Sequence, residues 1–477
     1  MTSKPFRRAL LQAAAAAPSH FLAGTRPAAA PARPRKNVIF MVADDLNNAL
    51  GCYGHPIVKT PHLDRLAARG VLFERAYCQF PLCAPSRASF LSGRRPETTG
   101  VLSLDTPTRQ HLRDVLMLPE FFRKQGYFSA QCGKIFHTGP EHEDPRSWDY
   151  MLPESGKNPP PSEILKQHKA GEPRNHSMAW MQLRTPDAGT PDGVVAQKAS
   201  ELIRQCAAQK RPFFLGVGFR RPHSPYAAPK KYFDLYDPDQ IPLPRRGNPS
   251  AIPAAAWYEL AGQPALSERE QREYIAAYYA CISFMDAQAG RLLATLDELN
   301  LWDQTVVVFL SDNGYHTGEH GMWHKMTLFE ESVRVPLIFA APGARGSGRR
   351  CAGLVELVDL YPTLVDCCEL KPPPGLEGTS LRPWLEDPTR AGKPAAYAMV
   401  GRNDDRNESH HKPTYYGRSV RTERWRYIEW DEGRRGRELY DLRMDAGETN
   451  NLAGEASYQG TMRQLSALLA KIPLRKT

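Results

Sequence analysis

The sequence has no long hydrophobic run, no repeated Cys-x-x-Cys spacing and no strong charge of one sign after residue 36. No stretch approaches the ~18 apolar residues of a membrane-spanning helix, so we expect a protein that is not transmembrane. The nine cysteines are an odd number without zinc-module spacing, which argues against a structural zinc site. An oxidising compartment would permit disulfides among them, and the sequence leaves their pairing open.

The net charge of +10 comes mostly from the N-terminal segment. Residues 1–36 hold seven Lys and Arg and no Asp or Glu, which leaves only +3 for the remainder. Such a balanced body argues against nucleic acid as a partner, because nucleic-acid binding needs a strong basic surface. The segment also carries Arg7-Arg8, an Ala-rich run and Pro- and Ala-rich sequence. It is typical of a Sec or twin-arginine export signal, which predicts a periplasmic or secreted protein; a disordered leader is the alternative.

Apolar runs of strand length alternate with helical patterns along most of the chain. The expected strands are 37–42, 128–132, 212–219, 305–310 and 335–340, and the expected helices are 61–70, 118–125, 194–209 and one opened by the capping box at 267–270. This alternation predicts an α/β fold with a mixed, mainly parallel sheet sandwiched by helices. Residues 140–190 lack periodicity and predict a surface insertion with short helices.

The character of the sequence changes after about residue 393. Short strand-like runs precede a helix near 459–471, which predicts a smaller C-terminal antiparallel α+β subdomain. We therefore expect an export signal or disordered leader over 1–36, an N-terminal catalytic domain over 37–392 and the C-terminal subdomain over 393–477.

Polar residues directly follow four of the expected strands. They are Asp44 with Asp45, Lys134 with His137, His223, and Asp312 with Asn313. Because ligands bind outside the carboxyl ends of strands in open α/β sheets, we expect these side chains to share one cleft. The acids and the amide oxygen suit a hard cation, Ca²⁺ or Mg²⁺. For Asp44 and Asp45 the alternative is helix capping, and for either histidine it is a hydrogen-bonded structural role.

Residues 80–94 place Cys83 next to the start of a short helix that ends at Gly93. The free N–H groups there favour an anion, and Arg87, one turn further, can reach the same point. Cys83 is therefore expected to be a reactive centre or a metal ligand; the alternative is a buried or disulfide-linked cysteine. Arg87, Lys134 and Lys325 could surround a tetrahedral anion and neutralise its charge, although Lys325 could also be an ordinary surface side chain.

The Cys-x-Pro-x-Arg pattern, followed by Leu-Ser-Gly-Arg, resembles the signature of the type I, formylglycine-dependent sulfatases. The resemblance covers about residues 37–385 and is closest to iduronate-2-sulfatase-like bacterial sulfatases. It rests further on Cys-Gly-Lys-Ile-Phe-His, Arg-Pro-His-Ser-Pro-Tyr and Gly-Glu-His-Gly-Met-Trp-His-Lys. It implies an alkaline phosphatase-like fold. Asn313 stands where iduronate sulfatase has histidine, so the resemblance leaves the exact sugar open.

The same resemblance implies an enzyme that hydrolyses sulfate monoesters on a sulfated carbohydrate, with 2-O-sulfated uronate as one candidate. Cys83 would be converted to formylglycine by a formylglycine-generating or anaerobic sulfatase-maturing enzyme, and the hydrate of formylglycine would attack sulfur. One Ca²⁺ would be held by Asp44, Asp45, residue 83, Asp312 and Asn313.

The resemblance also implies roles for the remaining polar residues. Lys134 would bind sulfate, with Arg87 and Lys325 adding positive charge around it. His137 would orient or deprotonate the hydrate, and His223 would protonate the departing oxygen.

Three alternatives stay open. A phosphate mono- or diesterase or phosphonate hydrolase of the same superfamily would bind an anion of similar shape and different charge. A non-catalytic sulfated-glycan-binding protein would keep the fold, although intact Cys83, His137 and His223 argue against it. A cysteine hydrolase would use Cys83 and His137 directly.

Overall fold

The computed structural model describes residues 35–154, 159–169, 178–248, 251–258, 265–404, 411 and 413–474. The export signal expected over 1–36 lies almost wholly outside these residues. From Arg35 onward the chain forms one compact unit, and the boundary expected between residues 392 and 393 stays a prediction. Among the described residues, no helix combines the length and the apolar character needed to cross a membrane. All nine cysteines are free thiols.

An eight-stranded sheet lies at the centre, in the order β13-β2-β12-β9-β1-β7-β3-β4. Its strands are β1 (Asn37–Asp44), β2 (Val71–Tyr77), β3 (Phe128–Gly133), β4 (Tyr150–Leu152), β7 (Phe213–Pro222), β9 (Thr305–Ser311), β12 (Arg334–Ala340) and β13 (Arg350–Glu356). Neighbouring strands run parallel except β12, which is antiparallel to both β9 and β2. The prediction of a mixed, mainly parallel sheet is confirmed.

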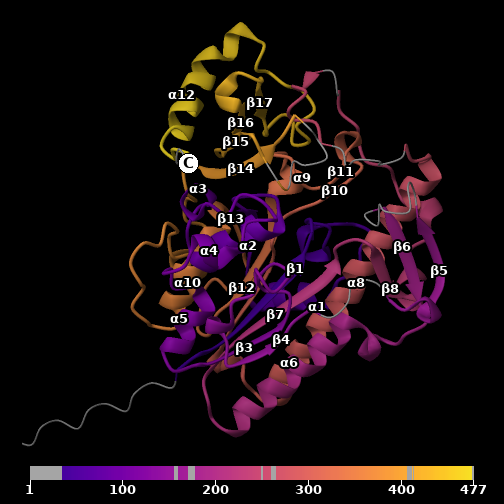
Figure 1. The fold of residues 1–477 in the computed structure, drawn as a ribbon, viewed down its shortest axis with the longest axis vertical. Helices are drawn as coiled ribbons and strands as arrows, with labels where there is room; N and C mark the ends of the chain where they lie inside the picture. The colour runs from indigo at the N-terminus through magenta and orange to yellow at the C-terminus, as the bar shows by residue number, and fades with distance from the viewer. Residues whose placement is uncertain are drawn as a thin grey trace, which may run out of the picture. The chain divides into compact units, whose positions relative to one another are not determined.

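Helices cover both faces of this sheet. The longer ones are α1 (Pro61–Arg69), α2 (Cys83–Ser92), α5 (Leu118–Lys124), α6 (Pro191–Ala208), α8 (Glu268–Glu298) and α10 (Leu360–Cys367). Alternate residues of β1 enter two different cores: Phe40 belongs to the core that contains residues of α2, α5 and α10, whereas Met41 belongs to the core that contains residues of α1, α6 and α8. Figure 1 shows these helices around the sheet. Because both faces of β1 are buried, the strand reads as one continuous apolar run. The expected capping box, Ser267 with Glu270, opens α8.

Short helices fill the connections. They are α3 (Pro96–Thr99), α4 (Thr108–His111), α7 (Lys230–Phe233), α9 (Glu330–Val333) and α11 (Arg382–Glu386). A two-stranded ribbon, β10 (His316–Thr317) with β11 (Trp323–His324), follows β9.

The insertion over 140–190 differs from the expectation. Besides single helical turns it contains β4, β5 (Ile164–Lys169) and β6 (Ala179–Leu183). β6 pairs with β5 and also, in parallel, with β8 (Tyr226–Pro229), which follows the large sheet's β7. This pairing joins segments more than forty residues apart, so local sequence patterns carry no sign of it.

The C-terminal part is an antiparallel sheet with one helix, as the sequence predicts. The sheet runs β14 (Ala396–Arg402), β15 (Tyr415–Arg421), β16 (Trp425–Trp430) and β17 (Arg437–Asp441). Val420 and Leu439 on one face pack against Leu465 of α12 (Gln459–Leu469), while Ile428 on the other face belongs to the core of the large sheet.

A buried ion-pair network joins the segment after α2 to β13 and β14. Arg95 donates two parallel hydrogen bonds to Glu356, from Nη1 at 2.7 Å and from Nη2 at 2.6 Å. Lys393 binds Glu356 at 2.9 Å and Asp359 at 2.5 Å. The N–H of Tyr397 also donates to Glu356, at 3.0 Å. One carboxylate therefore holds together three segments that are distant in the sequence.

Glu356→Gln should destabilise the fold in a pH-dependent way. Burial alone would raise the pKa of Glu356, but the charges of Arg95 and Lys393 outweigh it and lower the pKa to about 2. At pH 7 we expect a loss of about 3–5 kcal/mol, because the substitution leaves buried cations without their partner. The difference from wild type should shrink as pH falls below about 4.3, the ordinary glutamate pKa, towards 2, where the folded wild type protonates too.

Urea unfolding of both proteins between pH 7 and pH 3 measures this difference. Glu386→Gln is the matched control, since it removes an exposed pair with Arg345 (3.1 Å) and should cost less than about 1 kcal/mol. Equal losses in the two variants would contradict the prediction.

Candidate active site

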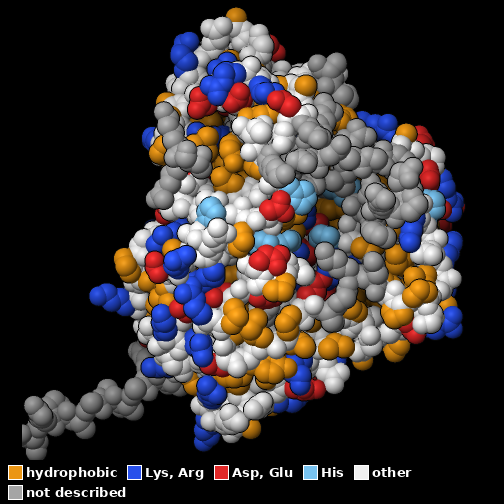
Figure 2. Space-filling view, in the orientation of Figure 1, with side chains coloured by type: hydrophobic (Ala, Val, Ile, Leu, Met, Phe, Trp, Pro, Cys, Tyr) orange, Lys and Arg blue, Asp and Glu red, His pale blue; other side chains and the backbone are white. Residues whose placement is uncertain are grey.

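Four parallel strands bring the expected site residues to one edge of the large sheet. Asp44 ends β1, Asp312 follows β9, Lys134 follows β3 and His223 follows β7. β9, β1, β7 and β3 are adjacent and parallel, so their carboxyl ends meet. Figure 2 shows histidine and acidic side chains close together near the middle of the face drawn. These residues therefore meet at one edge of the sheet, and their shared function stays a prediction.

Three carboxylates form the centre of the site. Asp44, Asp45 and Asp312 are buried and each offers an oxygen within 4.8 Å of the others. Asp312 accepts hydrogen bonds from the backbone N–H groups of Asp45 (3.1 Å) and Asn313 (2.9 Å). Burying three such groups together is unfavourable unless cations or a metal ion compensate them.

Arg87 and Lys134 compensate the acids on one side. The Arg87 guanidinium donates from Nε to Asp312 (2.8 Å), from Nη2 to Asp44 (3.3 Å) and from Nη1 to the carbonyl of Lys134 (2.6 Å). The ammonium of Lys134 lies 2.6 Å from the second oxygen of Asp44. Although burial would raise the pKa of Asp44, the positive charge of Lys134 and its neighbours holds it well below the usual range. Arg87 thus uses all three nitrogens to fix the site.

Lys325 compensates the acids on the other side. It follows β11, and its ammonium binds Asp45 and lies 3.0 Å from the sulfur of Cys83. Only 12% of this side chain is exposed, which excludes the alternative of an ordinary surface lysine.

Cys83 lies among these groups as the first residue of α2. Its sulfur is 3.4 Å from an oxygen of Asp44 and 3.8 Å from one of Asp45. Burial, followed by the charge of Asp44, raises the pKa of the thiol to about 12. The thiol is therefore not ionised at neutral pH, which makes it a poor nucleophile and argues against a cysteine hydrolase.

The two candidate histidines lie on different sides of the acids. His223 Nε2 is 3.7 Å from Asp45, its Nδ1 is 2.6 Å from the carbonyl of Ser224, and a quarter of its side chain is exposed. Burial lowers its pKa to about 3. The His137 ring meets the edge of His142, with ring centres 4.8 Å apart, and burial and then the charge of Lys134 lower its pKa. Both rings are neutral at pH 7 in this arrangement.

The donor set fits a hard divalent cation. Besides the three carboxylates, Asn313 places its side-chain oxygen in the interior, where that atom has no hydrogen-bond partner among the described residues. Its amide nitrogen donates to Asp45 at 2.9 Å, so the amide group lies beside the acids. A buried carbonyl oxygen without a donor is costly, and a bound cation would satisfy it.

The profile of the Sulfatase family matches residues 36–370, about 70% of the chain. The chain belongs to the sulfatase family. It is a sulfuric ester hydrolase, and the residues that carried the resemblance lie within the matched range. The C-terminal profile described as "N-sulphoglucosamine sulphohydrolase, C-terminal" matches residues 318–474.

Individual relatives align with this sulfatase over most of its length. Human iduronate 2-sulfatase is 32% identical, covering 83% of this chain and 84% of its own. A sulfatase of Formosa agariphila is 30% identical, covering 92% of this chain and 87% of its own. Among solved structures, the phosphonate monoester hydrolase of Agrobacterium radiobacter has a TM-score of 0.76 and 25% identity, covering 92% of this chain and 95% of its own.

Sequence analysis gave no role to several charged residues beside the site of this sulfatase. Arg220 and Arg221 precede His223 by three and two residues, and Asp192 accepts hydrogen bonds from both of their backbone N–H groups (2.9 and 3.0 Å). Glu154 forms an ion pair with Arg220. The pair of arginines before Pro-His is the one sequence pattern that could have indicated a role in the site. No local pattern marks Asp192 or Glu154 as functional.

Arg87→Lys should destabilise the protein although it keeps the charge. One ammonium cannot replace a planar fork that binds two carboxylates and two carbonyls. We expect a loss of about 1.5–3 kcal/mol for each charged hydrogen bond that is not remade, measured by urea unfolding at pH 7. Arg65→Lys is the control, because Arg65 forms an exposed pair with Asp297 (2.6 Å). A change at Arg87 no larger than the change at Arg65 would disprove the prediction.

Proposed function

We propose that this sulfatase removes sulfate from a sulfated carbohydrate, with 2-O-sulfated uronate as the first candidate. The observation that carries the proposal is the position of Cys83, enclosed by Asp44, Asp45 and Lys325 at the head of α2. The similarity to iduronate 2-sulfatase supports a sugar sulfate as substrate.

The nucleophile of the proposal is formylglycine at position 83. Conversion replaces the thiol by an aldehyde, a two-electron oxidation that a formylglycine-generating or anaerobic sulfatase-maturing enzyme would perform. The hydrated aldehyde carries two hydroxyls on one carbon, so one can attack sulfur and the other can expel the sulfated group by elimination. The high pKa of the unconverted thiol supports this need for conversion.

Other side chains of this sulfatase would bind the sulfate group, hold the site in place and transfer protons. Lys134 and Lys325 bind the sulfate oxygens and neutralise charge that develops as the ester bond breaks. Arg87 holds the acids and the helix in place. His223, partly open to solvent, gives a proton to the departing sugar oxygen, and the incoming anionic sulfate raises its pKa towards the value that this task needs. His137, neutral and beside Lys134, accepts a proton from the hydrate.

The metal of the proposal is one Ca²⁺. Asp44, Asp45, residue 83, Asp312 and Asn313 would hold it, since all of them can offer oxygen once residue 83 is a hydrated aldehyde. The bound ion would supply positive charge next to the sulfate ester.

We also propose that the protein is exported to the periplasm or the medium. The support is the composition of residues 1–36, with paired arginines, an Ala-rich run and no acids. Cell fractionation with an intact and an Arg7→Lys, Arg8→Lys leader tests export and distinguishes the twin-arginine from the Sec route.

Cys83→Ala should abolish turnover of sulfate esters. Peptide mass spectrometry of the active wild type should find residue 83 lighter than cysteine, because an aldehyde has replaced the thiol. Cys78→Ala is the matched control, since that buried cysteine lies five residues earlier and its sulfur lies 3.8 Å from the carbonyl of Ser332. An unmodified Cys83 in fully active protein would refute this nucleophile.

Parallel rates on an aryl sulfate, an aryl phosphate and an aryl phosphonate ester separate the proposal from its rival. The structural likeness to a phosphonate monoester hydrolase makes this comparison necessary. We expect the sulfate to react fastest. A faster phosphate or phosphonate reaction would replace the proposed activity, and turnover of any of these esters would exclude a purely binding role.

Asn313→Leu should weaken calcium binding without changing the charge of the site. For the wild type, Ca²⁺ at a hundred times its Kd should add about 2.7 kcal/mol of stability, seen as a rise in Tm. The variant lacks the buried amide oxygen and should lose most of this rise, whereas Asn313→Asp, which keeps an oxygen, should retain it. Asn450→Leu, at an exposed asparagine, is the control. Equal Ca²⁺-dependent shifts in wild type and Asn313→Leu would contradict calcium ligation by Asn313.

A further inference from the structure

Two adjacent arginines bulge out of β7 beside the acid cluster. Ala43 of β1 pairs with Phe219, but the next residue, Asp44, pairs with Pro222, so Arg220 and Arg221 have no partner in β1. The bulge therefore lies at the carboxyl end of the two strands, next to Asp44. Bulges of this kind redirect side chains near active sites.

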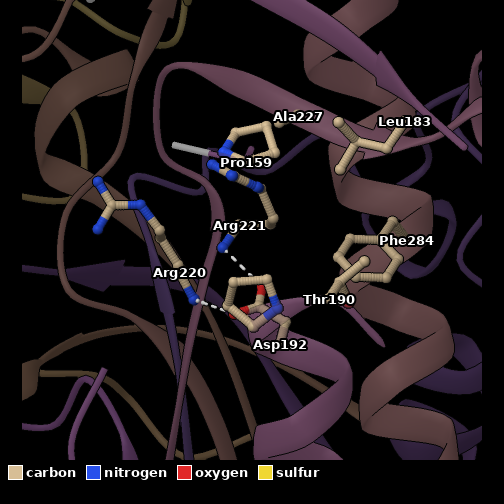
Figure 3. A pocket seen from close by; sticks show the side chains of 9 residues that line it. Pro159, Leu183, Thr190, Asp192, Arg220, Arg221, Ala227 and Phe284 are labelled. Carbon is tan, nitrogen blue, oxygen red and sulfur yellow. Dashed lines mark hydrogen bonds between the residues drawn. The ribbon is translucent and has the colours of Figure 1, made fainter. Parts of the chain in front are cut away.

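One buried carboxylate holds the bulge in shape. Asp192, near the start of α6, accepts the N–H of Arg220 at 2.9 Å and the N–H of Arg221 at 3.0 Å. Figure 3 shows these two bonds and shows the two arginine side chains leaving in different directions. Arg221 extends to the carbonyls of His223 (2.7 Å) and Pro225 (2.8 Å), so it supports the histidine loop.

Arg220 and Arg221 both line a small cavity, and the Arg220 side chain leaves the bulge in a different direction from that of Arg221 (Figure 3). It is only 3% exposed, pairs with Glu154, and its Nε has no hydrogen-bond partner among the described residues. Its backbone carbonyl accepts the N–H of His223 at 3.0 Å. The charges of Asp44, Cys83 and Asp45 act on this guanidinium, while burial and then Arg221 lower its pKa to about 10.

These observations describe a buried arginine that leaves the sheet beside Asp44 and has a donor, Nε, without a partner among the described residues. By contrast, all three guanidinium nitrogens of Arg87 donate hydrogen bonds to acids or carbonyls. Within the described ranges, Nε of Arg220 has no hydrogen-bond partner and its guanidinium pairs with the carboxylate of Glu154. A planar guanidinium with spare donors is suited to bind a second carboxylate or sulfate through two parallel hydrogen bonds.

We propose that Arg220 recognises a second anionic group of the saccharide, a carboxylate or an additional sulfate next to the scissile ester, and that Glu154 holds the guanidinium until that group arrives. This rests on the proposed function. Recognition exchanges one carboxylate partner of the guanidinium for an anionic group of the substrate, so the charge of the guanidinium is balanced before and after. Arg220 therefore selects polyanionic saccharides over singly charged sulfate esters.

The test uses pairs of substrates that differ in one anionic group. One pair is a sulfated uronate and the same sugar with its carboxyl reduced to an alcohol; the other is a disulfated monosaccharide and its monosulfated counterpart. The selectivity is the ratio of kcat/KM within each pair. Arg220→Gln should lower this ratio by about 10- to 100-fold, as expected for a lost charged hydrogen bond. The pair that responds identifies the anion as carboxylate or sulfate.

Two further variants separate recognition from a merely structural role. Glu154→Gln removes the competing carboxylate and should raise the ratio, opposite to Arg220→Gln. Arg220→Lys keeps the charge but lacks the planar fork, so it should give an intermediate ratio. Arg204→Gln is the control, because Arg204 forms an exposed pair with Glu298 (2.6 Å) far along α6 and should leave the ratio as in wild type.

The proposal is overturned if Arg220→Gln lowers kcat/KM equally for both members of every pair, or if the Arg220 and Glu154 variants shift the ratio in the same direction. Failure of the proposed function would give a different result: wild-type protein in which residue 83 is converted would turn over no sulfate ester.

Discussion

The whole site depends on one buried ion-pair system, in which Arg87 binds Asp312 and Asp44 at once. Arg87 belongs to α2, whereas the two acids belong to the ends of β9 and β1. Because the guanidinium is rigid and its partners are fixed by the sheet, the first turn of α2 has little freedom to shift. Cys83 lies one turn earlier on the same helix. The arginine thus determines where residue 83 meets the acids, and the network of Arg95 and Glu356 fixes the chain just after that helix.

Charge balance explains why the cluster can be buried. Three carboxylates face Arg87, Lys134 and Lys325 at hydrogen-bond distance, so no acid lacks a cation. The balance is nevertheless uneven, because Asp44 meets two cations and its pKa is lowered, whereas burial raises the pKa of Asp312 to about 6. Lys325 also touches the sulfur of Cys83. In the proposed function, the cations are therefore already in position to receive an anion at residue 83.

Local sequence patterns were sufficient to predict which side chains meet at the edge of the sheet, and insufficient to predict what surrounds them. Asp44, Lys134, His223 and Asp312 each follow a continuous apolar run, and parallel strands bring such positions together. The reversed direction of β12 and the pairing of β6 with β8 could not be predicted in this way, because each depends on segments distant in the sequence.

The same limit applies to the ion pairs. Arg95 and Glu356 are 261 residues apart, and neither has a neighbour that indicates the other. Arg220 directly precedes the Arg-Pro-His-Ser-Pro-Tyr motif. Only the register of β1 against β7 shows that it leaves the sheet beside Asp44. A sequence shows which residues stand at the end of a predicted strand or helix. It does not show which charged side chains keep a donor without a partner after folding. That last property separates Arg87, whose nitrogens all bind acids and carbonyls, from Arg220, whose Nε has no partner in the described part of the chain and which we propose to bind an anionic group of the substrate.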